Sequence, residues 1–288
     1  MATISIIVPM YNVAGYIATC CESIRKYWRE GLQVVLVDDG STDGSMAIAS
    51  QALAGLNVIT VTQTNQGVSV ARNKAMQAAT GDYLLFLDSD DFLLSVPHID
   101  GLADIYTGDY LFWDGTNLTT PNNLSWNATR RYLVKRELIT THNLWFIPDL
   151  SCGEDITWCA ELLQLPNTRK ASLDAPFYAY TYKRQGSLST QLSVTSMTDL
   201  LNAITMALAK HPSMKRQLYT IAFLYINAYW QFNASDRRTI RYAYRQIFPW
   251  LCHFLYPVSL GLYICKRLRQ KYQSLSPSTT PPPISTGV

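Results

Sequence analysis

Hydrophobic runs alternate with stretches of helical spacing over the first ninety residues. The runs lie at 4–8, 32–37, 58–61 and 83–87. They are dominated by Ile, Val and Leu without regular polar alternation, as in strands that are covered on both faces. Helices are predicted between them, from 12 to about 28 with Asn12 as N-cap, from about 45, and from 68 to 79. This alternation predicts an α/β fold with a doubly wound, mostly parallel sheet.

Three carboxylates follow the fourth run within four residues, at Asp88, Asp90 and Asp91. Ligands of open α/β sheets bind beyond the carboxyl ends of the strands. Carboxylates this close repel each other, and a divalent cation that also binds substrate phosphates relieves the repulsion. The pattern therefore favours a cation site, with a solvated acidic turn that caps the next element as the alternative.

Polar residues also follow two other runs, at Tyr11–Asn12 and at Asp38–Asp39. Because parallel strands end at one edge of their sheet, the three clusters predict one pocket. The chain has neither the Gly-x-Gly-x-x-Gly fingerprint nor the Gly-x-x-x-x-Gly-Lys-Ser/Thr loop that bind phosphates in other α/β folds. Metal-assisted phosphate binding is the remaining hypothesis.

The pattern is looser from 96 to 192. Strands are predicted at 109–113, 132–134 and 177–182, with a short helix at 135–139. Glu154 and Asp155 precede an amphipathic helix. Acidic residues in a first helical turn are ordinary partners of the helix dipole, so this pair alone does not identify a site.

The C-terminal third contains two aromatic, nearly uncharged stretches, at 217–232 and 246–265. The second stretch is 20 residues long, enough to cross a bilayer, but Pro249 and Pro257 interrupt it. Three alternatives stay open for it: a helix in the membrane interface, a packed core helix and a true span. Residues 274–288 are expected to form a disordered tail. The predicted division is 1–95, 96–192, 193–273 (helical region) and 274–288 (tail).

Composition narrows the class of protein only slightly. The net charge of +3 is too small to indicate nucleic-acid binding. The six cysteines show neither Cys-x-x-Cys pairs nor zinc spacing, and the chain enters its first strand without a signal-peptide pattern. These features predict a cytoplasmic chain with reduced thiols.

Several short motifs, in order and spacing, resemble family 2 glycosyltransferases with the GT-A fold. They are Ile-Val-Pro-Met-Tyr-Asn at 7–12, Val-Asp-Asp-Gly-Ser-Thr-Asp at 37–43, Asn-Gln-Gly-Val-Ser-Val-Ala-Arg-Asn at 65–73, Gly-Asp-Tyr at 81–83 and Leu-Asp-Ser-Asp-Asp at 87–91. The resemblance is close over 3–95 and looser to about 190. It implies that 1–95 is the nucleotide-sugar-binding, Rossmann-like donor half of the GT-A domain and that 96–192 is its acceptor-side half. It implies transfer of a sugar from a nucleotide diphosphate donor, with uracil as the usual base and with inversion at the anomeric carbon.

The resemblance also assigns roles to individual residues. It implies a nucleobase site at Pro9, Tyr11 and Asp39, a nucleotide-phosphate segment with Gly67 and Arg72, and Arg184 closing over the diphosphate. Asp88 and Asp90 form the family's Asp-x-Asp motif, which holds Mn²⁺ or Mg²⁺, and Asp88 also faces the ribose. Asp155 is the implied catalytic base and Glu154 shapes the acceptor site. Arg72 could equally form a surface or strand-end salt bridge, and Arg184 could be an ordinary surface residue.

The expected activity is a metal-assisted hexosyl or N-acetylhexosaminyl transfer from UDP to a glycan or lipid-linked acceptor in bacterial cell-surface polysaccharide synthesis. The chain lacks the Gln-x-x-Arg-Trp motif of the family's processive synthases, which favours single addition. Peripheral contact with anionic lipid on the inner face of the plasma membrane is expected. One alternative is a catalytically silent nucleotide-sugar-binding or membrane scaffold module. Another is a sugar nucleotidyltransferase, but the Gly-rich loop that it needs is missing after the first strand.

Overall fold

The computed structural model describes residues 2–121, 128–182, 193–225 and 232–247. The chain divides into a unit of residues 1–240 and a unit of residues 241–288. Of the second unit, only the end of helix α9 (Ala234–Ile247) is described. The finer division into donor half, acceptor half, helical region and tail stays a prediction.

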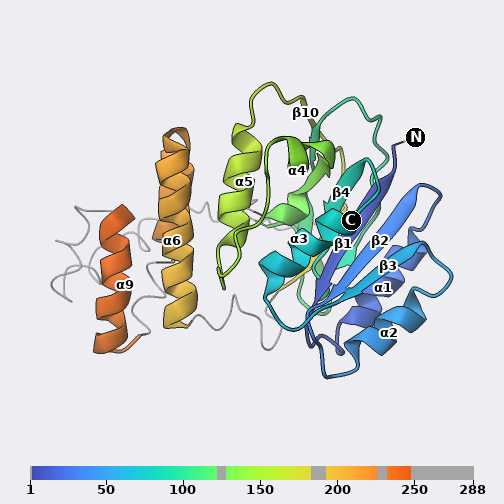
Figure 1. The fold of residues 1–288 in the computed structure, drawn as a ribbon, viewed down its shortest axis with the longest axis horizontal. Coiled ribbons are helices and arrows are strands. Elements are labelled where there is room, and N and C mark those ends of the chain that lie inside the picture. Colours follow the sequence, from blue (N-terminus) through green and yellow to red (C-terminus); the bar gives the residue numbers. More distant parts are fainter. Residues whose placement is uncertain (1, 122–127, 183–192, 226–231, 248–288) are drawn as a thin grey trace, which may run out of the picture. The chain divides into compact units, whose positions relative to one another are not determined.

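A seven-stranded sheet forms the centre of the first unit (Figure 1). Its strands, in spatial order, are β10 (Lys170–Ser172), β6 (Ile105–Thr107), β9 (Tyr132–Lys135), β4 (Tyr83–Phe86), β1 (Ile4–Met10), β2 (Leu32–Asp38) and β3 (Val58–Thr62). The pairs β1–β2, β2–β3, β1–β4 and β6–β10 are parallel, whereas β9 runs antiparallel to both of its neighbours. The predicted mostly parallel α/β sheet is therefore confirmed, with one reversed strand.

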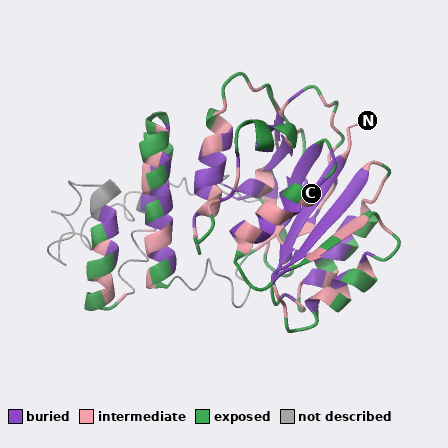
Figure 2. Ribbon diagram, viewed as in Figure 1, coloured by how far each residue is buried: buried purple, intermediate pink, exposed green. Residues whose placement is uncertain are grey.

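Helices cover both faces of this sheet, which explains why its central strands lack polar alternation. Helices α1 (Ile17–Lys26) and α2 (Ser45–Ala52) lie on one face, and α3 (Val68–Ala78), α4 (Glu137–Thr141) and α5 (Glu154–Gln164) on the other (Figure 1). Alternate residues of β1 enter different cores: Ile6 packs with α1, and Ile7 packs with α3. Figure 2 shows the resulting burial of the central strands.

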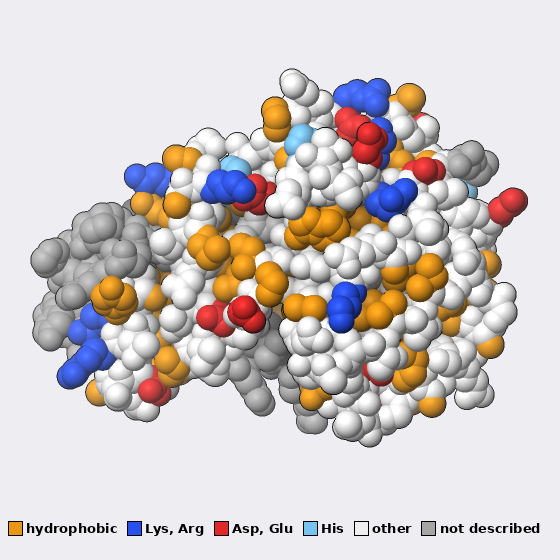
Figure 3. Space-filling view, in the orientation of Figure 1, with side chains coloured by type: hydrophobic (Ala, Val, Ile, Leu, Met, Phe, Trp, Pro, Cys, Tyr) orange, Lys and Arg blue, Asp and Glu red, His pale blue; other side chains and the backbone are white. Residues whose placement is uncertain are grey.

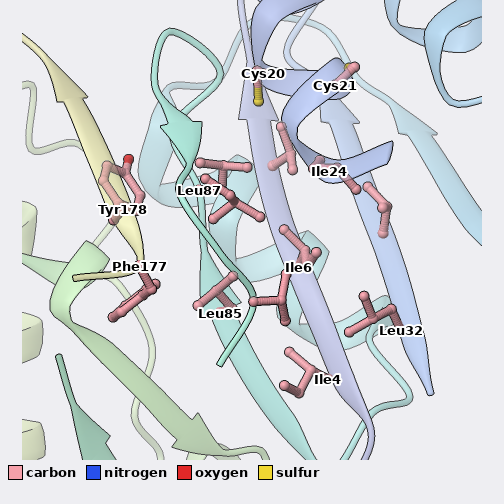
Figure 4. Packing of buried hydrophobic residues seen from close by; sticks show 14 of the residues in the cluster. Ile4, Ile6, Cys20, Cys21, Ile24, Leu32, Leu85, Leu87, Phe177 and Tyr178 are labelled. Carbon is pink, nitrogen blue, oxygen red and sulfur yellow. The ribbon is translucent and has the colours of Figure 1, made fainter. Parts of the chain in front are cut away.

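A second, four-stranded sheet packs beside the α1 core. It contains, in spatial order, β5 (Phe92–Leu93), β11 (Tyr178–Thr181), β7 (Tyr110–Trp113) and β8 (Leu118–Thr119). Phe177 and Tyr178 reach the same buried cluster as Leu85 and Leu87 (Figure 4). The two sheets therefore share one core at the end of β4.

The first strand is longer than the predicted 4–8 run, because β1 continues through Pro9 to Met10. Met10 still pairs with β2, whereas the ladder to β4 ends at Ile7 and Phe86. Pro9 lacks the N–H that would donate the next hydrogen bond to β4, so the β1–β4 ladder cannot continue. The β1–β2 ladder loses no hydrogen bond at Pro9. The proline therefore ends one ladder rather than the strand.

Asn12 does not cap the first helix, which begins at Ile17 after Tyr16. It has a φ of 48°, a conformation that asparagine tolerates better than most residues. Its side chain instead accepts a hydrogen bond from the Thr42 N–H at 2.9 Å, and its own N–H donates to Ser41 Oγ at 3.0 Å. Asn12 thus joins the loop after β1 to the loop after β2.

Further helical segments complete the described chain. They are η1 (Thr129–Arg131), α6 (Val194–Lys210), η2 (Pro212–Met214) and α7 (Lys215–Leu224). Within the described ranges, no helix combines the length and apolar character needed to cross a membrane. The predicted membrane-facing stretch at 246–265 lies almost entirely outside those ranges, as does the tail. On the face drawn in Figure 3, charged side chains of described residues form small separate groups rather than one extended basic surface.

Candidate active site

Several predicted site residues lie at the point in the large sheet where the order of the strands reverses. From β1 the chain adds β2 and then β3 on one side, and β4 pairs with the other side of β1. Such a reversal of strand order is the point at which open α/β sheets bind ligands, beyond the carboxyl ends of the strands. Pro9, Asp39 and Asp88 all lie at these ends. Tyr11 follows β1 and is 48% exposed, so its ring is accessible.

Asp39 is buried and organises the loop after β3. Its Oδ1 accepts hydrogen bonds from Gln63 Nε2 and the Gln66 N–H, both at 2.7 Å, and its Oδ2 accepts one from the Gly67 N–H at 2.8 Å. Gly67 precedes α3 with a φ of 87°. One lone pair of Oδ2 remains for a further donor such as a ring N–H. Asp39 therefore has a structural role that the sequence did not reveal.

Arg72 connects the acidic turn after β4 with the start of α5. Its residue exposure is 3%, and its guanidinium makes three ion pairs. Nη2 lies 2.8 Å from Asp88 Oδ1, and Nη1 lies 2.8 Å from Glu154 Oε1 and 3.1 Å from Asp155 Oδ1. Of the two alternatives considered for Arg72, the surface salt bridge is wrong because the residue is buried, whereas a strand-end salt bridge is present with Asp88 after β4. The residue brings together three predicted site residues that are far apart in the sequence.

Aromatic packing holds this guanidinium in place. It lies 5.2 Å from the centre of the Phe146 ring, which stacks on Trp158 at 5.0 Å with an interplanar angle of 5°. Phe86 meets both rings edge-on. A planar guanidinium above aromatic rings keeps its in-plane N–H groups free for carboxylates. The aromatic cluster thus sets the direction in which Arg72 binds its acids.

The environment of Asp155 suits a group that exchanges a proton near neutral pH. Its pKa is raised to about 7 in total: burial is the largest cause, the Arg72 guanidinium lowers the pKa, and the nearby Glu154 and Asp88 carboxylates raise it. A general base is most effective when its pKa lies near the working pH. Asp155 therefore combines a fixed position with a suitable proton affinity.

Gly153 sets the start of α5 and hence the positions of both acids. Its φ is +91°, and a Cβ there would lie 2.9 Å from Ala203 Cβ and 3.1 Å from Leu200 Cα. Both atoms belong to α6, which a hydrogen bond from Ser151 Oγ to Asp199 Oδ2 at 2.7 Å also fixes to this turn. Close contact with α6 thus positions the acidic pair.

We expect Gly153→Ala to lower the free energy of unfolding by about 2–5 kcal/mol, from the positive φ and the steric overlap together. Gly44→Ala is the matched control, because Gly44 precedes α2 with a φ of +86° and has open space around its Cβ position. The control should lose only about 1–2 kcal/mol. Equal losses in denaturant unfolding would show that α6 does not restrict this turn.

Asp91 has a different role from the two acids before it. It is buried, and its carboxylate accepts hydrogen bonds from Tyr178 Oη at 2.6 Å and from the Thr181 N–H at 2.7 Å. Burial, with Asp90 and Asp88 adding to it, raises its pKa well above the usual range. Asp91 fastens the small sheet to the acidic turn, so the alternative of a solvated turn is wrong for this residue.

Asp88 and Asp90 suit a divalent cation that is bound together with a substrate. The Asp88 side chain is 25% exposed and uses Oδ1 for Arg72, and Asp90 is partly exposed. Among the described residues, no group of three or more His, Cys, Asp or Glu could hold a metal ion. Mg²⁺ sites of substrate-bound type use one or two carboxylates plus phosphate oxygens and water, and two carboxylates fit that requirement.

Two arginines complete the comparison with the sequence predictions. Arg184 lies outside the described residues. Arg130 was not predicted, yet its guanidinium carbon lies 4.8 Å from the centre of the Tyr110 ring and 4.2 Å from that of Tyr180. The available signal was indirect: aromatic residues recur at every second position in 110–112 and 178–182, which predicts an aromatic strand face but not what covers it.

Residues 5–137 match the family model described as Glycosyl transferase family 2. These residues are a family 2 glycosyltransferase domain. They include Arg72, Asp88 and Asp90 and end before the acidic pair of α5. A putative glycosyltransferase of Bacillus subtilis, EpsH, is 40% identical over 91 residues, which cover 31% of this chain and 26% of EpsH. Across four curated relatives, the aligned parts span only 16% to 53% of the relative's length.

Similarity to solved structures establishes the fold of this chain as GT-A. TarS of Staphylococcus aureus (residues 1–349, in complex with UDP-GlcNAc) superposes with a TM-score of 0.69 at 20% identity, covering 85% of this chain and 80% of that one. The mannosyltransferase PcManGT of Pyrobaculum calidifontis, in complex with GDP-Man and Mn²⁺, gives a TM-score of 0.61 at 19% identity, covering 95% and 82%. The predicted family and GT-A fold are thus confirmed.

Proposed function

We propose that this chain is an inverting glycosyltransferase that adds a single sugar from a UDP-linked donor to a glycan or lipid-linked acceptor of the cell surface. The observation that carries the proposal is the joining of Asp88 to Glu154 and Asp155 through buried Arg72. One guanidinium thus contacts both Asp88, the acid proposed for the phosphate side, and Asp155, the proposed base. Both groups are needed for a displacement at the anomeric carbon.

In the proposed reaction, Asp155 accepts the proton of the acceptor hydroxyl as that oxygen forms its bond to the anomeric carbon. The bond from this carbon to the diphosphate oxygen breaks in the same displacement, and the nucleotide diphosphate leaves with the bonding electron pair. Glu154, next to the base, shapes the acceptor site. Asp88 and Asp90 would hold Mn²⁺ or Mg²⁺ together with the phosphates. The cation supplies charge neutralisation of the leaving group.

The nucleotide assignment has support from the relatives and from the loops after β1 and β2. The two structural neighbours were solved with different nucleotide sugars, UDP-GlcNAc and GDP-Man. We propose Tyr11, Pro9 and Asp39 as the base site, with uracil as the base. Gly67 and Arg184 are proposed to lie beside the phosphates. Peripheral contact with anionic membrane and a location at the inner face of the plasma membrane stay predictions.

A donor screen tests the proposed function. Release of nucleotide is measured from UDP- and GDP-linked sugars with Mn²⁺, with and without membrane extract as the source of acceptor. We expect release from a UDP-sugar that increases when extract is added. Binding of nucleotide and metal without release from any donor would favour the silent binding module instead.

The pKa of Asp155 predicts how transfer depends on pH. The ionised carboxylate is the active form, and a pKa raised to about 7 leaves it protonated below that pH. Transfer at low acceptor concentration should therefore rise through an apparent pKa near 7 and level off above it. The measurement is kcat/KM for the acceptor between about pH 5.5 and 8.5 at saturating donor. A profile with an apparent pKa of about 4, the ordinary carboxylate value, would contradict the assignment.

A further inference from the structure

Arg130 differs from Arg72 in having no acid bound to it. Its guanidinium forms no ion pair with any carboxylate of the described residues, and its enclosed Nε has no hydrogen-bond partner. Its described contacts are the faces of Tyr110 and Tyr180.

Burial lowers the pKa of Arg130, whereas the Asp91 and Asp88 carboxylates lie near enough to raise it, but neither pairs with its N–H groups. Enclosing a guanidinium without bound acceptors is costly, and stacking on aromatic rings offsets only part of that cost. The arrangement therefore points to an anionic ligand.

The small sheet explains how Arg130 is held. Tyr178 is in register with Tyr110, and Tyr180 with Phe112, so these four rings share one face of the parallel β7–β11 pair. Arg130 belongs to η1 and lies across this face. Stacking fixes the plane of the guanidinium and leaves its edge N–H groups available in a geometry that matches phosphate oxygens.

Tyr178 connects this aromatic face to the acidic turn after β4. Tyr178 Oη donates to Asp91 at 2.6 Å and accepts a hydrogen bond from the Asp88 N–H at 3.2 Å. The carboxylates of α5, in contrast, are held by Arg72 from the other face of the large sheet. Tyr178 thus belongs to the aromatic face on which Arg130 stacks, and it also holds the turn that carries Asp88 and Asp90. On the proposed function, this is the diphosphate side of the reaction.

We propose that Arg130 is a further substrate-binding residue of this domain, and that its guanidinium binds oxygens of the donor's β-phosphate, next to the transferred sugar. The inference rests on the proposed function. It assigns charge neutralisation of the diphosphate to two sources, the cation at Asp88 and Asp90 and the arginine on the small sheet. Arginine binds phosphate through two parallel N–H···O bonds, which lysine cannot reproduce.

Binding of UDP and UMP to the full chain in Mn²⁺ tests this inference, because UMP lacks the β-phosphate. The variants are Arg130→Met, which keeps an aliphatic side chain on the rings, and Arg130→Lys. Arg131→Met is the matched control from the same turn, since Arg131 donates to the Gly108 carbonyl and pairs with Asp109 instead. We expect Arg130→Met to weaken UDP binding about tenfold or more, with Arg130→Lys in between. UMP binding by all variants, and UDP binding by Arg131→Met, should stay within about twofold of wild type.

The outcomes separate this inference from the proposed function. Wild-type chain that binds no nucleotide diphosphate would contradict both. Wild-type binding of UDP with unchanged affinity in Arg130→Met would overturn the role of Arg130 alone. Equal weakening of UDP and UMP would show a structural role, and a higher acceptor KM with unchanged UDP affinity would place Arg130 on the acceptor side. Either result overturns the inference.

Discussion

Replacing Asp155 with asparagine is expected to abolish sugar transfer while UDP and Mn²⁺ still bind. The amide keeps the shape of the side chain and can accept from Arg72, but it cannot take the proton of the acceptor hydroxyl. Loss of a general base typically lowers the rate by 10²–10⁴-fold, and we expect about 10³-fold here. Transfer is measured by nucleotide release with saturating acceptor, and binding by calorimetry.

Two neighbouring acids provide the controls for this experiment. Glu154→Gln removes a charge from the same Arg72 nitrogen and should reduce transfer far less than Asp155→Asn. Asp90→Asn should weaken Mn²⁺-dependent UDP binding as well as transfer, because Asp90 is assigned to the cation. Transfer at the wild-type rate by the Asp155→Asn chain would exclude Asp155 as the base.

Replacing Arg72 with methionine should destabilise the fold more than any surface change. Methionine retains contact with Phe146, but Asp88, Glu154 and Asp155 then lose the cation that binds all three. Removing one partner from a buried ion pair costs about 3–5 kcal/mol, because the remaining charges stay buried without compensation. The free energy of unfolding is obtained from denaturant titration above pH 7, because the pKa of Asp155 is raised to about 7.

A second-site change distinguishes electrostatic from packing losses. Arg72→Met combined with Glu154→Gln should recover part of the lost stability, since one uncompensated charge is removed. Arg169→Met removes an exposed side chain whose nitrogen lies 3.7 Å from Asp104 and should change stability by less than about 1 kcal/mol. If Arg72→Met itself stays within about 1 kcal/mol of wild type, the three carboxylates do not depend on Arg72.

The strands of the donor half could be predicted because strands that are buried on both faces consist of continuous apolar residues. β1, β2, β3 and β4 all coincide with apolar runs, and their shared edge follows from parallel pairing. β9 was also predicted as a strand, at 132–134, but its reversed direction could not be predicted. Its apolar residues fit either direction, and only the path of residues between β4 and β9 decides which one occurs.

The site was predictable as a set of residues but not as a network. Asp88 and Asp91 have the same local sequence character, yet one faces Arg72 and the other fastens β11. Which way each carboxylate turns depends on partners that lie 16 and 90 residues away. Arg130 was missed for a related reason, since stacking on tyrosine rings requires the tertiary structure of the small sheet.

The contacts of Arg72 also bear on how the chain folds as it is made. Its bonds to Glu154 and Asp155 span 82 and 83 residues, whereas its bond to Asp88 spans only 16. Domains fold from the N-terminus during translation, and long-range contacts form late because closing a long loop costs entropy. Strands β1 to β4 can therefore assemble while Arg72 is matched by Asp88 alone. The carboxylates of Glu154 and Asp155 become available only when α5 is synthesised, so Arg72 pairs with one acid first and receives its full set of partners only after about eighty further residues have been made.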